Sequence, residues 1–315
     1  MKAAVLHAPG DAPHFEDVPE PEPGEGQEVL QVTACPLTNL DRMLAAGTHF
    51  ASSANLPAVC GTLAAGRFSD GTRVLFRSPG GAMAEQAVAD RALCTPIPEG
   101  LADDLAAAVQ NPGVSTWAAL EWRAKLRPGE RVLVLGATGV AGRMAVQLAR
   151  RLGAGRVVAA GRNAGVLAAL PGIGADATIR LDRPDDELRA AFRAEGSFDV
   201  VLDYLWGRPA EVFISTLGHT DMVLRSACTR FVQVGSTAGA DVSLSADLLR
   251  SSGLEIAGFG TGNAPPAAEL DRLRGQVMDL VASGDLRIDV RRVPLAQVRE
   301  VWNLDQQGIR TVLIP

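Results

Sequence analysis

The sequence predicts an α/β protein in which a doubly wound parallel sheet follows a strand-rich first domain. Residues 131–153 predict a buried strand, a glycine turn and a helix in direct succession. Strand-like and helical runs alternate from there, which is typical of a parallel sheet with crossover helices. Before this segment, short strands separated by Gly and Pro turns dominate the chain, so we expect a separate β-rich domain there.

The composition is that of an ordinary globular protein with room for two domains. The chain has 315 residues, of which 47% are hydrophobic and 21% charged. The net charge of −6, without clustered Lys and Arg, argues against nucleic-acid binding. There is no signal segment and no apolar run long enough to cross a membrane, so we expect a cytoplasmic protein that does not bind membranes. The four cysteines stand singly and predict no disulfide framework: Cys35, Cys60, Cys94 and Cys228.

The first domain is expected over residues 1–115 and begins with short strands. A Pro-rich connection from Pro19 to Gly26 separates the first strand from the second. From Leu101 the pattern becomes helical. The expected elements are strands at 3–6, 28–33, 73–76 and 82–89, and helices at 102–110 and 116–124.

The second domain is expected over residues 116–260 and holds the parallel sheet. Its predicted strands are 132–135, 157–160, 198–202, 231–234 and 254–257, with helices following the first two strands at 144–152 and 164–170. The rest of the chain, 261–315, is expected to rejoin the first domain. Its predicted elements are a helix at 267–283, a strand at 287–290, a helix at 295–305 and a strand at 311–314.

The glycine turn of the second domain has the pattern G-x-x-G-x-x-G. Backbone N–H groups at a helix start lack partners within the helix and lie at its positive dipole end, so they can receive a pyrophosphate where no side chain blocks it. The alternative is a plain tight turn. The cradle residues are Gly136, Ala137, Thr138, Gly139, Val140, Ala141 and Gly142.

The order of these segments resembles the medium-chain dehydrogenase/reductase superfamily, most closely its zinc-independent quinone oxidoreductase (zeta-crystallin-like) branch. The resemblance covers nearly all of the chain. It rests on the segments Pro19 to Leu30, Leu126 to Gly142, Ala145 to Ala154, Phe198 to Asp203 and Arg230 to Gly235. It implies a Rossmann domain inserted into a discontinuous GroES-like catalytic domain, with nicotinamide and substrate bound in the cleft between them. It also implies a homodimer joined near Leu254 to Gly260.

The chain departs from the zinc-using relatives at their ligand positions. Those relatives carry a cysteine three residues before the aspartate that corresponds to Asp41, where this chain has Thr38. A G-H-E segment is replaced by Gly61-Thr62-Leu63. Because catalytic zinc needs three or four protein ligands, we expect no metal. Quinone oxidoreductases usually place asparagine at the position of Thr38, whereas Asn39 follows one residue later, so either residue is a candidate to face the cleft.

The end of the second Rossmann strand distinguishes the two nicotinamide cofactors. An acid there binds the adenosine ribose, whereas an arginine accommodates a 2′-phosphate. The chain has Gly161, Arg162 and Asn163 and no carboxylate, which predicts NADPH. The alternative is a solvent-facing Arg162. Turns expected near the nicotinamide, with ordinary loops as the alternative, are Gly235 with Ser236, and Gly258 with Phe259 and Gly260.

Other enzyme classes lack their motifs in this chain. A short-chain dehydrogenase needs a Tyr-x-x-x-Lys pair, but the single tyrosine, Tyr204, is followed by Arg208. No nucleophile elbow of a serine hydrolase is present. Without zinc, the expected acceptors are quinones and α,β-unsaturated carbonyls, and the candidate cleft residues are Thr38, Asn39, Asp41 and Tyr204. Asp41 and Tyr204 have structural alternatives, as a cap or packing residue. A zinc-free ketone reductase and a cofactor-binding protein without turnover remain alternative functions.

Overall fold

The computed structural model describes residues 1–52, 55–218 and 228–315. It divides into two compact units, one made of residues 1–111 and 274–315 and the other of residues 112–273. The sequence predicts divisions after residues 115 and 260. Both observed divisions fall inside helices, α2 (Asp103–Ala118) and α8 (Ala267–Ser283).

The first unit is built from two sheets contributed by both ends of the chain. A three-stranded sheet has the order β2-β1-β4, and a seven-stranded sheet has the order β15-β16-β3-β5-β6-β8 with β7 paired to β3. The strands are β1 (Lys2–Leu6), β2 (His14–Asp17), β3 (Gln27–Pro36), β4 (Ala58–Val59), β5 (Ala64–Arg67), β6 (Arg73–Phe76), β7 (Gln86–Asp90), β8 (Thr95–Pro96), β15 (Val290–Pro294) and β16 (Arg310–Ile314). The short helices are α1 (Asn39–Ala45), η1 (Arg91–Leu93), η4 (Leu295–Gln297) and α9 (Val298–Val301).

Three predicted elements of this unit are wrong in extent. The strand expected at 82–89 begins only at Gln86, because the N–H groups of Ala82 and Met83 donate to Cys60 in a loop. The strand expected at 287–290 begins at Val290. The helix expected at 295–305 ends at Val301, because Arg42 binds the carbonyls of Trp302 and Leu304 at 2.7 and 2.9 Å.

The two helices expected at 102–110 and 116–124 are also wrong, because they form one continuous segment. α2 runs through Pro112 and continues as a π-helix, η2 (Ala119–Arg123). Proline removes one helical hydrogen bond and usually breaks a helix. Here Ala106 and Ala119, on either side of Pro112, are both fully buried, and this apolar burial opposes the break.

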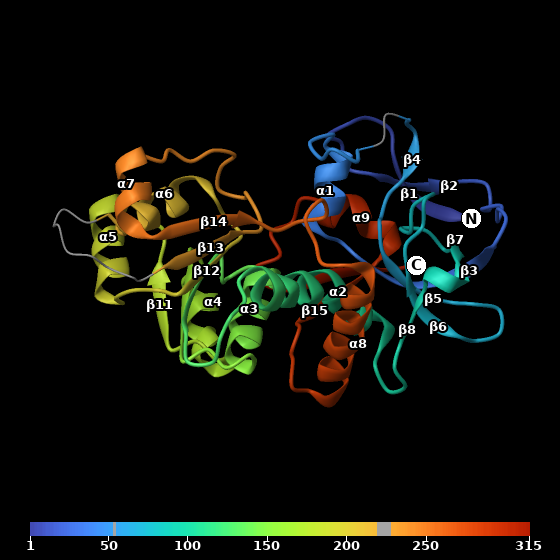
Figure 1. The fold of residues 1–315 in the computed structure, drawn as a ribbon. Helices are drawn as coiled ribbons and strands as arrows, with labels where there is room; N and C mark the ends of the chain where they lie inside the picture. The colour runs from blue at the N-terminus through green and yellow to red at the C-terminus, as the bar shows by residue number, and fades with distance from the viewer. Residues whose placement is uncertain (53–54, 219–227) are drawn as a thin grey trace. The chain divides into compact units, whose positions relative to one another are not determined.

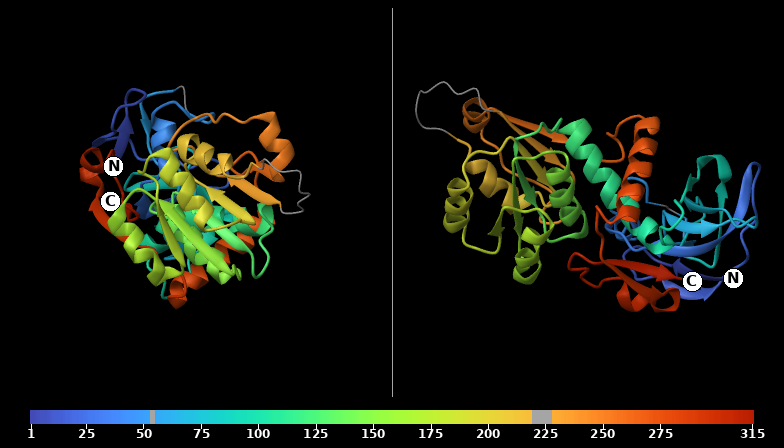
Figure 2. Two further views of the ribbon diagram at one scale, coloured as in Figure 1. Left: turned by 90° about the vertical axis from the view of Figure 1, so that its left-hand side faces the viewer. Right: turned by 90° about the horizontal axis from the view of Figure 1, so that it is seen from below.

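The second unit is a six-stranded parallel sheet of order β11-β10-β9-β12-β13-β14. α3 and α4 cover one face and α5 and α6 the other (Figures 1 and 2). The chain moves outward from β9 to β11, returns to β12 beside β9 and then moves the other way, so the strand order reverses between β9 and β12. Ligands of such sheets bind at the carboxyl edge of this switch point.

The strands and helices of the second unit alternate as predicted, which confirms the α/β class. Its strands are β9 (Arg131–Leu135), β10 (Arg156–Gly161), β11 (Ala177–Arg180), β12 (Val200–Asp203), β13 (Thr229–Gln233) and β14 (Leu254–Gly258). Its remaining helices are α3 (Val140–Arg151), α4 (Ala164–Ala169), η3 (Leu170–Ile173), α5 (Asp185–Ala194), α6 (Gly207–Ser215) and α7 (Ala246–Ser252). Phe213 of α6 anchors the core, with its ring 5.3 Å from Phe192 and 6.2 Å from Phe231. Within the described ranges, none of the helices has the length and apolar character needed to cross a bilayer.

Candidate functional site

The glycine turn lies between β9 and α3, at the switch point of the parallel sheet. Gly136 leaves the strand with a φ of +89°, in the left-handed region that favours glycine. Gly139 is the N-cap of α3, and no side chain caps the helix there. As in any α-helix, the first N–H groups of α3 have no partners within the helix, and here no side chain caps them either. Free N–H groups at the positive end of a twelve-residue helix suit a phosphate group.

The three glycines of the turn have different roles. A Cβ on Gly142 would lie 2.2 Å from the Gly136 oxygen, so packing alone requires glycine at this position. A Cβ on Gly139 would lie 3.5 Å from that oxygen, an ordinary contact. Gly139 is exposed, so its missing side chain leaves room for a ligand. Thr138 and Ala141 are half-buried beside it, while Ala137 and Val140 are buried.

The end of β10 lies directly beside this turn. The N–H groups of Gly136 and Ala137 both donate to the Ala160 carbonyl at 2.9 Å. A Cβ on Gly161 would meet the Thr138 methyl at 2.4 Å, so glycine is required for this close approach. Asn163 caps α4, with its Oδ1 accepting from the Val166 N–H at 3.1 Å.

Arg162 is exposed at the same strand end. It forms no hydrogen bond or ion pair with any residue that the structure describes. Its role in binding a 2′-phosphate stays a prediction, with a solvent-facing arginine as the alternative.

Tyr204 follows β12 and packs under the glycine turn. A Cβ on Gly136 would lie 3.2 Å from the Tyr204 Cβ, and one on Gly235 would lie 2.8 Å from the Tyr204 carbonyl oxygen. Its hydroxyl is 2.7 Å from the Thr116 hydroxyl, and burial raises the pKa of the phenol. The phenol is therefore neutral at physiological pH and already has one hydrogen-bond partner.

Asp203 ends β12 and is fully buried, a position that the sequence analysis missed. Its carboxylate accepts the N–H groups of Leu205 at 2.8 Å and Trp206 at 3.1 Å. Trp206 has φ 55° and ψ −158°, a backbone region almost confined to glycine. Asp203 thus holds a strained turn at the carboxyl edge of the sheet. The available sequence signal was a carboxylate closing the apolar run Val200 to Leu202.

Replacing Asp203 with asparagine is expected to stabilise the protein at neutral pH. Burial raises the Asp203 pKa from 3.8 to about 6, so the folded state keeps its proton to a higher pH than the unfolded state does. Stability therefore falls as the pH rises through this window, by roughly 3 kcal/mol in total. Asparagine carries no charge and still offers Oδ1 to the two N–H groups.

Urea unfolding at pH 4 and pH 7 measures this effect. We expect Asp203→Asn to gain stability at pH 7 and little at pH 4. Asp203→Ala is the comparison variant, because it removes the charge but leaves both N–H groups without their acceptor, so its gain should be smaller. An equal gain for Asp203→Asn at both pH values would contradict the burial argument.

The remaining predicted turns follow β13 and β14. The Gly235 N–H donates to the Asp203 carbonyl at 3.1 Å, which holds Gly235 and the following Ser236 beside the Tyr204 segment. Phe259 is buried, and its ring lies 6.4 Å from Trp122. A Cβ on Gly258 or Gly260 would meet nothing within 4 Å. The structure thus brings the β9, β10, β12 and β13 ends together, while Gly258 to Gly260 lie at the end of or after β14, an edge strand.

In the first unit, Thr38 and Asp41 form the capping box of α1. The Thr38 N–H and hydroxyl both donate to Asp41 Oδ2, at 2.9 and 2.5 Å. The N–H and hydroxyl of Thr62, which the sequence analysis did not select, donate to Asp41 Oδ1 at 3.1 Å each. Asp41 is 3% exposed, and the four hydrogen bonds that it accepts connect the start of α1 to Thr62. The single hydroxyl proton of Thr38 is already donated.

Asn39 differs from its two neighbours, since it is exposed on the first turn of α1. The thiol of Cys35 is buried and donates to the Leu63 carbonyl at 3.2 Å, and burial raises its pKa. Within residues 1–52, 55–218 and 228–315, no three His, Cys, Asp or Glu side chains are grouped to hold a metal ion.

Comparison with known proteins gives relatives of two kinds. No protein-family model matches the chain. The polyketide synthase component PikAII of Streptomyces venezuelae is 32% identical over 299 residues, 90% of this chain and 7% of the synthase. The probable NADPH-dependent quinone reductase tdiC of Emericella nidulans is 30% identical over 222 residues, 66% of this chain and 61% of that protein. This chain spans only 7 to 11% of the length of the polyketide synthases that it matches first.

A solved structure covers the whole chain. The quinone oxidoreductase from Thermus thermophilus, described together with its NADPH complex, is 30% identical with a TM-score of 0.83, and each chain covers all of the other. This match spans both units and confirms the resemblance read from the sequence. The chain therefore belongs to the quinone oxidoreductases of the medium-chain dehydrogenase/reductase superfamily.

Proposed function

We propose that this protein is an NADPH-dependent oxidoreductase that transfers hydride to a quinone or an α,β-unsaturated carbonyl compound. The observation that carries the proposal is the N-terminus of α3, which has no side-chain cap, together with Arg162 at the end of β10, which has no partner among residues 1–52, 55–218 and 228–315. The Thermus thermophilus relative is described in complex with NADPH, and tdiC is named as an NADPH-dependent reductase, which supports the cofactor.

Different residues around the glycine turn bind different parts of NADPH. The first N–H groups of α3 receive the pyrophosphate, and Gly139 leaves it room. Arg162 pairs with the 2′-phosphate, because no carboxylate at the end of β10 repels it. The turns after β13 and β14, including Gly235, Ser236 and Gly258 to Gly260, line the nicotinamide side.

NADPH supplies the hydride when it is bound. The chain orients the acceptor and stabilises the negative charge that develops on its oxygen. Asn39 is the preferred donor to this oxygen, because its amide is exposed whereas the Thr38 proton is donated to Asp41. Asp41 and Thr38 hold the start of α1. We propose that no zinc takes part, since Thr38 and Gly61-Thr62-Leu63 stand at the ligand positions of zinc-using relatives.

NADPH oxidation with a panel of quinones, enals, enones and simple ketones tests this function, and product analysis identifies the reduced bond. We expect turnover of quinones or reduction of the conjugated C=C bond. Alcohols formed by 1,2-reduction would instead favour a ketone reductase. Tight NADPH binding without turnover of any acceptor would favour a non-catalytic cofactor-binding protein.

A homodimer joined through β14 is part of the proposal. β14 is one of the two edge strands of the six-stranded sheet, and Ile256 within it is 37% exposed. An outer strand with an exposed apolar side chain can pair with a second copy of itself. Sedimentation should give the mass of two chains, and the mass of one chain would contradict the dimer. The cytoplasmic location stays a prediction from the sequence.

A further inference from the structure

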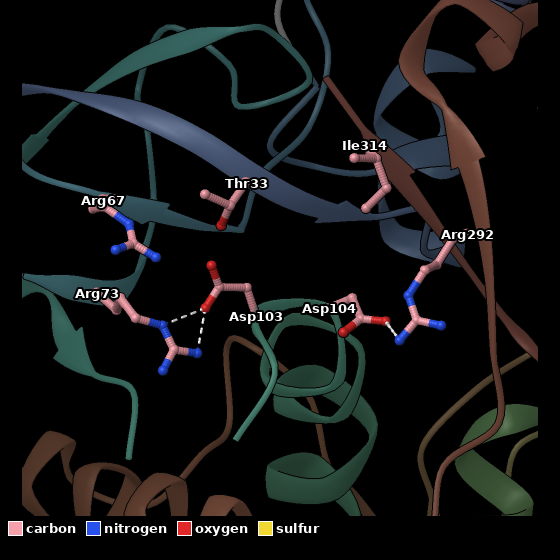
Figure 3. Close-up of a pocket in the computed structure, with 7 residues that line it drawn as sticks. All are labelled: Thr33, Arg67, Arg73, Asp103, Asp104, Arg292 and Ile314. Carbon is pink, nitrogen blue, oxygen red and sulfur yellow. Dashed lines mark hydrogen bonds and ion pairs between the residues drawn. The ribbon is translucent and has the colours of Figure 1, made fainter. Parts of the chain in front are cut away.

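A pocket of about 510 Å³ lies within the first unit, between its seven-stranded sheet and the first turn of α2 (Figure 3). None of its lining residues is among those assigned above to NADPH or the acceptor. Both ends of the chain contribute to its wall. The lining residues are Thr33, Arg67, Arg73, Asp103, Asp104, Arg292 and Ile314. A cavity of this size accommodates a small organic molecule.

Two of the three arginines in the pocket already have an anionic partner. Arg73 donates through Nε to Asp103 Oδ1 at 2.8 Å, and Arg292 Nη2 lies 2.6 Å from Asp104 Oδ2. Arg67 is exposed and makes no hydrogen bond or ion pair with any part of the chain that the structure describes. The lining therefore carries one unbalanced positive charge, and Arg67 provides it.

Thr33 supplies an unused hydrogen-bond donor in the same pocket. The pairing of β3 with β5 is irregular between Val32 and Ala34, so Thr33 lies in a bulge. Bulges redirect side chains, and they occur often beside functional sites. The Thr33 hydroxyl oxygen is buried and has no partner among the described residues. In Figure 3 it points into the pocket, between Arg67 and Asp103. A buried hydroxyl normally has a hydrogen-bond partner, so a ligand here would satisfy it.

We propose that this pocket binds a small organic monocarboxylate, which pairs with the Arg67 guanidinium and accepts a hydrogen bond from the Thr33 hydroxyl. A guanidinium fork matches a carboxylate through two parallel N–H donors. One negative charge balances the charge of the lining. A phosphate dianion fits less well, because the second oxygen of Asp103 points into the pocket and would repel the additional charge (Figure 3). The site requires neither NADPH nor the acceptor.

Calorimetric titration of the full chain with lactate tests the site, with inorganic phosphate and protonated ethanolamine as comparison ligands at constant ionic strength. We expect lactate to bind more tightly than phosphate and ethanolamine not to bind. Arg67→Gln should weaken lactate binding about tenfold or more, since it removes a charge-assisted pair. Arg67→Lys should fall between Arg67→Gln and the wild type. Thr33→Val should weaken binding, whereas Thr33→Ser should retain it.

Arg193→Gln is the matched control, because Arg193 is exposed on α5 in the other unit. It should bind lactate like the wild type. Thermal melting of each variant checks that it is folded. If Arg67→Gln or Thr33→Val unfolds, the conservative variants Arg67→Lys and Thr33→Ser still test the site. The proposal is overturned by no lactate binding at about 10 mM, where a millimolar Kd is detectable. Binding that is unchanged in Arg67→Gln, or phosphate binding as tight as that of lactate, also overturns it.

Discussion

Replacing Gly142 with alanine is expected to destabilise the protein by about 3 kcal/mol or more, at the upper end of the usual effect of overpacking. The added Cβ would lie 2.2 Å from the Gly136 oxygen and 2.6 Å from the Ala137 Cα. Both are backbone atoms of the turn that α3 packs against, so no side-chain rotation relieves the clash. Urea or guanidinium unfolding, followed by far-UV circular dichroism, measures the change.

Gly275→Ala is the matched control for this prediction. Gly275 also lies inside a helix, α8, but a Cβ there would meet nothing within 4 Å. Alanine is the better helix former, so this variant should gain roughly 0.5 to 1 kcal/mol. If Gly142→Ala proved as stable as the wild type, the close packing of α3 against the turn would be refuted.

Arg162→Gln is expected to raise the KM for NADPH about tenfold to a hundredfold, because it would remove the charge-assisted hydrogen bond that we propose between Arg162 and the 2′-phosphate. The KM for NADH should change little, since NADH carries a hydroxyl in place of that phosphate. The kcat with saturating NADPH should also change little, because Arg162 lies at the end of β10, away from the turns assigned to the nicotinamide. Steady-state kinetics with both cofactors and one active quinone measures the three values.

The difference between the two cofactors is the decisive readout for Arg162. Arg193→Gln, on the exposed surface of α5, should leave both KM values unchanged. An equal rise for NADPH and NADH would mean that Arg162 acts on the fold or on the shared pyrophosphate. An unchanged KM for NADPH would support the alternative of a solvent-facing arginine.

The parallel sheet was predictable because its signals are local. Residues 131–153 contain a buried strand, a glycine turn and a helix in sequence order, and the structure has β9 and α3 there. The continuity of α2 was not predictable in the same way. Pro112 and Gly113 indicate a break, and only burial of the alanines on both sides, which depends on distant segments, opposes it.

In the candidate site too, features with local sequence signals could be predicted, and features that depend on distant segments could not. The glycine turn from Gly136 to Gly142, between a strand and a helix, could be identified from spacing and context. The turn at Trp206 could not, because a tryptophan has no local preference for φ 55°, and its conformation depends on Asp203 and on packing. Asp41 is an intermediate case. Thr38-Asn39-Leu40-Asp41 fits a capping-box pattern, and the structure shows that box, yet Thr62 reaches Asp41 from a distant segment.

The two helices that cross the divisions of the chain constrain how the protein can be dissected. A fragment covering residues 112–273 would begin at Pro112 inside α2 and end at Leu273 inside α8. Cutting there would expose helix ends that have no caps and would shorten two continuous hydrogen-bond ladders. Transplanting the parallel sheet into another scaffold would therefore require complete copies of α2 and α8, not the compact unit alone.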